Sequence, residues 1–279
     1  MVATVDAVAP VESRTLVIAC GALARELLAI VRMNGLDSVT VECLPAALHN
    51  RPSEIPDAVR ARIHRARNPH PGAGADVRVM DRDIAVEGSH LLHTPDDVDP
   101  IDDHLRVVDP DIAVEGPHLI HTPDEAGTTY DSIFVAYADC GTGGLLQKVC
   151  AEEGVEMLDG AHCYEFFATA PRFAEIQDAE IGSFYLTDFL ARHFERMVWQ
   201  GLGLDRHPEL LPMYFGNYTR LVYLAQTDDP ELLALAQAGA DRLGLTMLVE
   251  RTGYGELEET MVELGTTGAA AGRAGGEPR

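Results

Sequence analysis

The residues of this chain best placed to do chemistry are two cysteines, each of which is followed by a glycine at the end of an apolar, strand-like run. Cys20 and Cys140 occupy these positions, and His162 and Cys163 follow a third apolar run. In an open α/β sheet, ligands bind at the carboxyl ends of the parallel strands. We therefore expect these side chains to share one edge of the sheet, where three or four sulfur and nitrogen groups suit zinc, iron or an iron–sulfur centre.

His49 follows another strand-like run and is a further candidate, either as a ligand or as an acid or base. A thiol at the start of a helix has its pKa lowered by the backbone dipoles, which favours the reactive or metal-binding thiolate. Cys20 and Cys140 are expected to gain from this effect. Cys43 lies late in a strand and Cys150 lies within an amphipathic helix, so both are expected to pack in the core.

A glycine-rich turn follows Cys140. It consists of Gly141, Thr142, Gly143 and Gly144. Such a turn is a candidate for binding the phosphate of a cofactor through backbone amides, but it lacks the Lys-Ser/Thr ending of a P-loop and the full dinucleotide fingerprint. A tight turn that positions Cys140 accounts for the same residues and is the favoured interpretation.

Alternating strand and helix patterns predict an α/β fold with a mostly parallel sheet and helices on both faces. The arrangement is Rossmann-like, and a version with two similar halves is left open. Strands are expected at 15–19, 38–43, 131–138, 155–158, 221–225 and 246–251, and helices at 22–33, 55–66, 143–153, 230–243 and through most of 163–213.

The predicted domain organisation has one α/β domain with an insertion. The limits are a disordered tail at 1–14, the domain at 15–265, the insertion at about 68–129 and a second disordered tail at 266–279. Within the insertion, segment 78–97 recurs at 106–125 with an offset of 28 residues and 15 of 20 positions identical. Each copy carries a His-x-x-His motif, which leaves a metal-binding insert open. An exposed duplicated element is favoured, because a surface insertion leaves the core unchanged.

The chain of 279 residues is strongly acidic, with a formal net charge of -24. Such a surface repels phosphate backbones and anionic membranes, so neither nucleic acid nor a membrane is an expected partner. High salt would screen this self-repulsion, which favours a halophilic host. The five cysteines are an odd number in a large chain and argue against a disulfide scaffold. With no signal-peptide pattern and no apolar run long enough to span a bilayer, a cytoplasmic protein is expected.

Several phrases in fixed order resemble the domain-of-unknown-function family 1638 of bacteria and archaea. They are Ala19–Leu23, Leu44–Pro52, Asp139–Gly144, Gly160–Glu165, Leu186–Leu190, Gly203–Leu210 and Gly253–Gly255. The resemblance spans about residues 15–260, and the duplicated segment departs from it. It implies a role near corrinoid-dependent methyltransferase systems, in one-carbon or corrinoid metabolism.

The leading hypothesis is a cytosolic metal-binding protein in which Cys20, Cys140 and Cys163, with His162 or His49, hold zinc, iron or an iron–sulfur centre. Its activity would be methyl or sulfur-group transfer on a small-molecule substrate, and a corrinoid is a further candidate cofactor. One alternative is a metal-free enzyme with Cys140 as nucleophile, His162 as base and the amides of the glycine-rich turn as oxyanion donors. Another is a non-catalytic accessory protein that binds a corrinoid or components of a methyltransferase system.

Overall fold

The computed structural model describes residues 13–68, 105–107 and 129–274. The predicted N-terminal tail, apart from its last two residues, lies outside the described residues. Nearly all of the predicted insertion, with both His-x-x-His motifs, lies outside them as well.

The first lobe is built on a five-stranded sheet. Its strands are β1 (Thr15–Cys20), β2 (Val39–Leu44), β3 (Leu105–Val107), β4 (Ser132–Ala136) and β5 (Glu156–Met157). Their order is β3-β2-β1-β4-β5, and every pairing is parallel. β1 and β2 are buried along their whole length, as expected for strands covered on both faces. The predicted parallel α/β architecture is confirmed.

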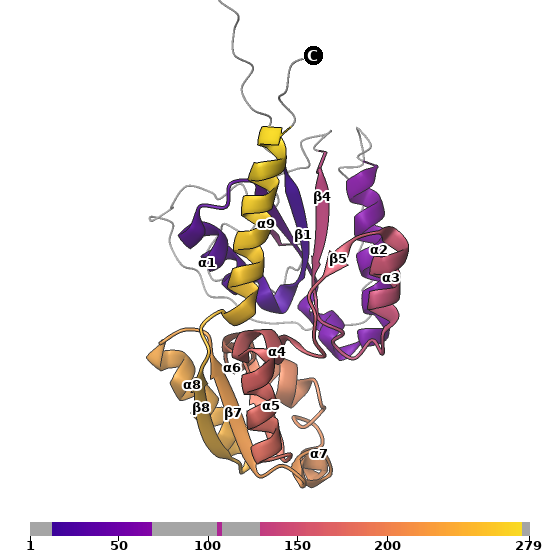
Figure 1. Cartoon of the computed structure of the whole chain (residues 1–279). Coiled ribbons are helices and arrows are strands. Elements are labelled where there is room, and N and C mark those ends of the chain that lie inside the picture. Colours follow the sequence, from indigo (N-terminus) through magenta and orange to yellow (C-terminus); the bar gives the residue numbers. More distant parts are fainter. Residues whose placement is uncertain (1–12, 69–104, 108–128, 275–279) are drawn as a thin grey trace, which may run out of the picture.

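Two helices cover each face of this sheet (Figure 1). α1 (Ala24–Asn34) and the last helix, α9 (Gly255–Ala274), lie on one face, and α2 (Ile55–Arg67) and α3 (Leu145–Glu153) lie on the other. Leu27 of α1 and Met261 of α9 are fully buried in the same core as the strands, although they are far apart in sequence. The lobe therefore depends on the C-terminal helix for part of its core.

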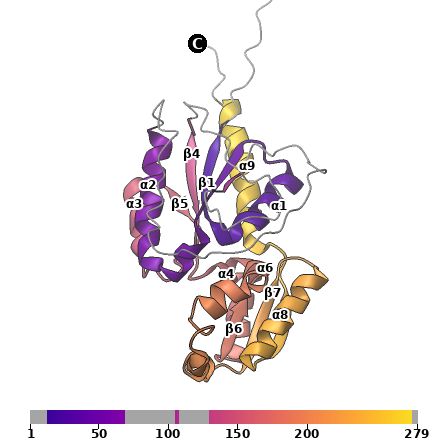
Figure 2. The same cartoon turned by 180° about the vertical axis from the view of Figure 1, so that it is seen from behind.

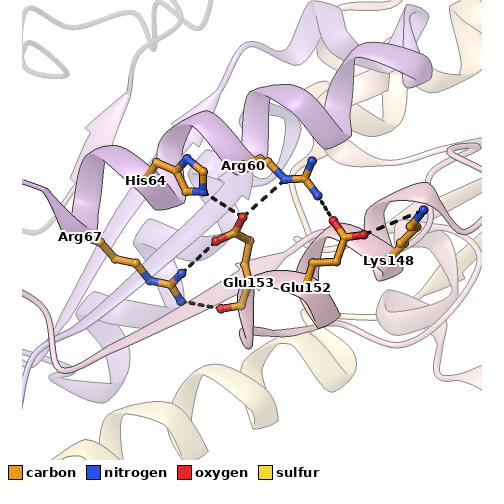
Figure 3. Close-up of polar contacts among 6 residues, drawn as sticks. All are labelled: Arg60, His64, Arg67, Lys148, Glu152 and Glu153. Atoms are coloured by element: carbon orange, nitrogen blue, oxygen red, sulfur yellow. Dashed lines mark hydrogen bonds and ion pairs between the residues drawn. The ribbon is translucent and has the colours of Figure 1, made fainter.

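A network of charged side chains joins α2 to α3 on the surface (Figure 3). Its members are Arg60, His64, Arg67, Lys148, Glu152 and Glu153. The Glu153 carboxylate lies 2.8 Å from His64 Nε2 and 2.9 Å from Arg67 Nη1. Arg67 also donates to the Glu153 carbonyl oxygen at 2.6 Å, which fixes the end of α3 against α2.

The second lobe is built on a separate three-stranded parallel sheet. Its strands are β6 (Ser183–Leu186), β7 (Arg220–Ala225) and β8 (Thr246–Arg251), in the order β6-β7-β8. The associated α-helices are α4 (Cys163–Ala168), α5 (Ala170–Ala179), α6 (Asp188–Arg192), α7 (Leu211–Phe215) and α8 (Pro230–Leu243). The chain also forms four 3₁₀ helices, at Gly21–Leu23 (η1), Ala46–Asn50 (η2), Pro52–Glu54 (η3) and Pro208–Leu210 (η5), and a π-helix at Glu195–Gln200 (η4), counted over the described residues.

Alternate residues of β7 belong to different cores of the second lobe. Leu221 and Tyr223 pack in the core formed with α6 and α8, while Val222 and Leu224 pack against α5. This is the alternation that a strand buried on both faces must show.

The two lobes meet where their parallel strands end. α6, which follows β6, contacts η1, which follows β1. α4 leads from the first lobe into the second, and α9 returns to the first, so the chain crosses between lobes twice (Figures 1 and 2). Gly255 makes the second crossing possible, because its φ is +52° and a Cβ there would lie 2.3 Å from the carbonyl oxygens of Phe166 and Phe167.

Three sequence-based predictions need correction. The region 163–213 contains strand β6, whose four residues are too few for their alternation to be distinguished from a helical pattern. The predicted disordered tail at 266–279 begins inside α9, which continues to Ala274. Strand β3 lies within the predicted insertion and pairs with β2 in the main sheet, whereas an exposed hairpin or loop was expected there. Among the described helices, including the 20-residue α9, none has the length and apolar character needed to cross a bilayer.

Candidate functional site

Four sulfur- and nitrogen-bearing side chains line one pocket, which we call the thiol pocket. They are Cys20, His49, Cys140 and Cys163, and the cavity between them is small, with a volume of about 10 Å³, close to the space that one water molecule needs. The remaining lining residues are Ala22, Leu23, Ala136, Tyr137, Ala138 and Phe166. Cys20 ends β1 and Cys140 follows β4, so the pocket lies at the carboxyl ends of the two strands between which the chain order reverses. Ligands of open α/β sheets bind at such a position.

The surrounding backbone brings these four residues together from distant parts of the chain. Cys20 is the last residue of β1 and precedes η1, and His49 lies in η2, directly after β2. Cys163 is the first residue of α4. The backbone N–H of Cys140 donates to the carbonyl of Ala161 at 3.0 Å, which holds the loop after β4 beside the start of α4.

Cys140 has an unusual backbone conformation. Its φ is +48°, in the left-handed region that residues other than glycine, asparagine and aspartate rarely adopt. Such a conformation costs on the order of 1 kcal/mol and occurs mostly where the surrounding structure requires it, often at functional sites. The strain is consistent with a backbone shaped to direct this side chain into the pocket.

The glycine-rich turn after Cys140 surrounds a carboxylate that belongs to the chain itself. Asp139 accepts hydrogen bonds from Gly144 N at 2.7 Å, Gly143 N at 3.1 Å and the Thr142 hydroxyl at 2.7 Å. Burial opposes ionisation of Asp139, but these hydrogen bonds outweigh it and lower the pKa of the carboxyl. Asp139 therefore occupies two of the amides that were predicted to bind a cofactor or an oxyanion. The turn thus holds the carboxylate of Asp139, the residue directly before Cys140.

Two of the three pocket thiols, those of Cys140 and Cys163, favour their neutral form. Burial raises the pKa of Cys140 to about 11, and it raises the pKa of Cys163 well above the ordinary value. The neighbouring thiols of Cys140 and Cys20 raise the pKa of Cys163 further. The expectation that a helix start lowers the thiol pKa is wrong for Cys140, because α3 begins only at Leu145 and because desolvation is the largest effect.

The two histidine candidates differ in position. His49 lines the pocket, and burial is the main reason that its pKa lies below the usual value, with the charge of His162 adding to the effect. His162 is exposed at the N-cap of α4 and is not part of the pocket lining. Of the two, His49 is therefore the histidine placed to act with the thiols.

The pocket side chains approach one another without forming a ready-made metal site. In the described part of the chain, no three His, Cys, Asp or Glu side chains are arranged so that they could hold a metal ion as they stand. Binding at the thiol pocket would require the thiols to turn toward a common point.

A comparison with protein families identifies the group to which this chain belongs. The family model described as "Protein of unknown function (DUF1638)" matches residues 119–261, which is more than half of the 279 residues. The chain is a member of the DUF1638 family. Cys140 and Cys163 lie within the matched segment, while Cys20 and His49 precede it. No curated protein and no solved structure matches the chain.

The two remaining cysteines of this DUF1638 protein are both buried. Cys150 lies in α3 at 2% exposure, and burial raises the pKa of its thiol to about 11. Cys43 is fully buried in β2, close enough to Tyr137 for its thiol to raise the pKa of that phenol. Neither lines the thiol pocket, as expected of packing residues.

Glu26 is a residue at the lobe boundary that sequence reasoning missed. It lies on the buried face of α1 with 5% of its surface exposed, and its Oε2 atom has no hydrogen-bond partner among the described residues. Burial is the largest cause that raises the pKa of Glu26 to about 7, and the charge of Asp188 in the second lobe adds to it. A glutamate on the apolar face of a helical pattern was the signal that could have identified it.

Asp188, in contrast, is fully satisfied. Its two carboxylate oxygens accept hydrogen bonds from the Tyr223 hydroxyl at 2.7 Å, from Gln226 N at 3.1 Å, and from the backbone and hydroxyl of Thr227 at 3.0 and 2.6 Å. These bonds join the start of α6 to the carboxyl end of β7. The residue organises the second lobe at the boundary with the first.

Proposed function

We propose that this protein binds a zinc or iron ion, or an iron–sulfur centre, through Cys20, Cys140 and Cys163, with His49 as the further ligand. The single observation that carries the proposal is the gathering of these four side chains in one pocket at the point where the strand order reverses. Three cysteine thiols and one histidine form a ligand set that soft or borderline metals prefer.

The neutral state of the thiols supports the same proposal. Burial raises the pKa values of Cys140 and Cys163, so these two thiols do not readily become thiolates in the absence of a cation. A bound metal ion supplies the missing positive charge and displaces the thiol protons. Metal affinity at this site should therefore increase with pH.

The rest of the pocket lining is mostly alanine, leucine and phenylalanine, which suits a small and partly apolar substrate. Because the cavity of about 10 Å³ holds no more than about one water molecule, the pocket would have to open to admit such a substrate beside the metal. A thiolate-bound metal ion supplies a Lewis acid, or a site that holds a thiolate nucleophile. Methyl or sulfur-group transfer in one-carbon or corrinoid metabolism remains our proposed context, together with a cytoplasmic location in a halophilic host.

Three features weigh against the metal-free cysteine enzyme. The pKa of Cys140 is raised to about 11, the proposed base His162 is exposed outside the pocket, and Asp139 occupies the amides of Gly143 and Gly144. A nucleophilic thiol needs the opposite of each feature.

Metal analysis of untagged protein tests the proposal. The wild type should contain close to one metal ion, or one cluster, per chain, and a Cys20→Ser, Cys140→Ser double variant should contain none. Cys150→Ser is the matched control, because this buried cysteine lies on α3 outside the pocket. Folded wild-type protein that takes up no zinc or iron, even when supplied with either metal, would refute the proposal, as would a double variant that keeps its metal.

A further inference from the structure

Tyr137 is a buried polar residue of the thiol pocket that the proposed ligand set does not use. It directly follows β4, lines the pocket and is only 1% exposed. It is among the largest side chains of the protein that are fully buried. A phenylalanine would fill nearly the same space, so the hydroxyl group requires its own explanation.

Tyr137 lines the same pocket as the three cysteines of the proposed ligand set. No oxygen or nitrogen atom of the described residues forms a hydrogen bond with the Tyr137 hydroxyl. Burial is the main cause that raises the pKa of this phenol. The neighbouring Cys20, Cys43 and Cys140 add to the effect, Cys20 also through a side-chain hydrogen bond. A buried hydroxyl without a good partner costs about 1–3 kcal/mol, and such groups in native proteins call for a functional explanation.

A neutral thiol is a poor partner for this hydroxyl, but a thiolate would be a good one. The S–H group is a weak donor and its sulfur is a weak acceptor. Once the proton leaves, the charged sulfur accepts a much stronger, charge-assisted hydrogen bond. The environment of Tyr137 therefore fits the metal-bound form of the pocket better than the metal-free form.

We infer that Tyr137 is a positioning residue, which donates its hydroxyl hydrogen bond to the Cys20 sulfur when that sulfur is a metal-bound thiolate. The inference rests on the proposed function and deepens it by assigning an outer partner to one ligand. Partners of this kind orient metal ligands and tune the metal, and their removal typically weakens metal binding 10- to 100-fold.

The test compares Co²⁺ binding by the wild type, Tyr137→Phe and Tyr185→Phe. Co²⁺ is the probe because a sulfur-bound cobalt ion absorbs light through sulfur-to-metal charge transfer. Tyr185 is the matched control, since it belongs to the second lobe and does not line the pocket. Tyr137→Phe should bind Co²⁺ about 10- to 100-fold more weakly and shift the charge-transfer band, while Tyr185→Phe should match the wild type.

The possible outcomes separate the two proposals. A wild type that binds no Co²⁺ argues against the metal site itself, and this inference fails with it. A wild type and a Tyr137→Phe variant with the same affinity and the same band overturn the inference alone. If Tyr137→Phe does not fold, Tyr137→Met repeats the comparison, because methionine also fills the space without a hydroxyl group.

Discussion

Replacing Glu26 with glutamine is expected to stabilise the metal-free protein by an amount that grows with pH. Glu26 lies at the boundary between the lobes, and its pKa is raised from 4.5 to about 7, mainly by burial. In the unfolded chain the carboxyl loses its proton near pH 4.5, whereas in the folded protein it must keep the proton until about pH 7. The folded state therefore loses stability relative to the unfolded state as the pH rises through this window.

The size of the effect follows from the two pKa values. A difference of one pKa unit corresponds to about 1.4 kcal/mol, so the full penalty on the wild type is about 3 kcal/mol once the pH exceeds 7. Glutamine carries no proton to lose, so Glu26→Gln avoids the penalty at every pH. The free energy of unfolding of the variant, relative to that of the wild type, should rise by about 3 kcal/mol across the window.

Urea unfolding of both proteins at a series of pH values measures this difference. Glu231→Gln, at an exposed position on α8, is the control for the general benefit of removing one negative charge from an acidic chain. A difference between Glu26→Gln and wild type that stays constant with pH, or that matches the control, would refute the reasoning. In that case the lobe boundary would admit water or rearrange to solvate the carboxylate.

Three further predictions concern other parts of the molecule. In metal-free protein, iodoacetamide should alkylate Cys140 slowly at neutral pH and faster only toward pH 11, because the thiol pKa is raised. Mass spectrometry measures the rate of alkylation, and a fast reaction at pH 7 would contradict the raised pKa. Asp188→Asn should reduce the free energy of unfolding by about 2–4 kcal/mol, because the amide cannot accept all the hydrogen bonds of the carboxylate. Urea unfolding measures this loss, and a loss below about 1 kcal/mol would count against the role of Asp188. Glu153→Gln should lower the melting temperature in dilute buffer but much less in concentrated salt, since salt screens surface ion pairs. A decrease in melting temperature that does not depend on salt would show that charge is not the cause.

The lower pKa of Glu153, caused first by its hydrogen bond to His64, adds a pH dependence to the last of these predictions. The wild type should hold its advantage over Glu153→Gln above the ordinary glutamate pKa. The advantage should disappear as the pH falls through the lowered value in the folded protein. Thermal melts at several acidic pH values would detect it.

The strand ends of the first lobe could be predicted from the sequence because continuous apolar runs mark buried parallel strands. Cys20, Cys140 and Cys163 each follow such a run, and the rule that ligands bind at the carboxyl ends of strands was enough to bring them together. His49 could be placed at the same edge by the same reasoning. The sequence could not show that His162 is exposed and outside the pocket lining, since the burial of adjacent loop residues depends on the detailed conformation of the loop.

The features that sequence reasoning missed depend on contacts between distant segments. Strand β6 has only four residues, and it exists because β7 supplies its hydrogen-bond partners. The pKa of Cys140 depends on how deeply folding buries it, which no local pattern reveals. Glu26 and Tyr137 gain their interest from neighbours that folding brings to them, Asp188 for the first and the thiols for the second.

The path of α9 limits how this chain can be divided for experiments. Leu257 and Met261 on this helix are completely buried in the first lobe, although the helix follows the last strand of the second. A fragment that ends after β8 would lack those two side chains and leave apolar surface of α1 and β1 in water, a condition that promotes aggregation. Dissection of the protein into separately expressed halves should therefore keep residues 255–274 with the N-terminal segment, for example by a circular permutation that joins the two ends.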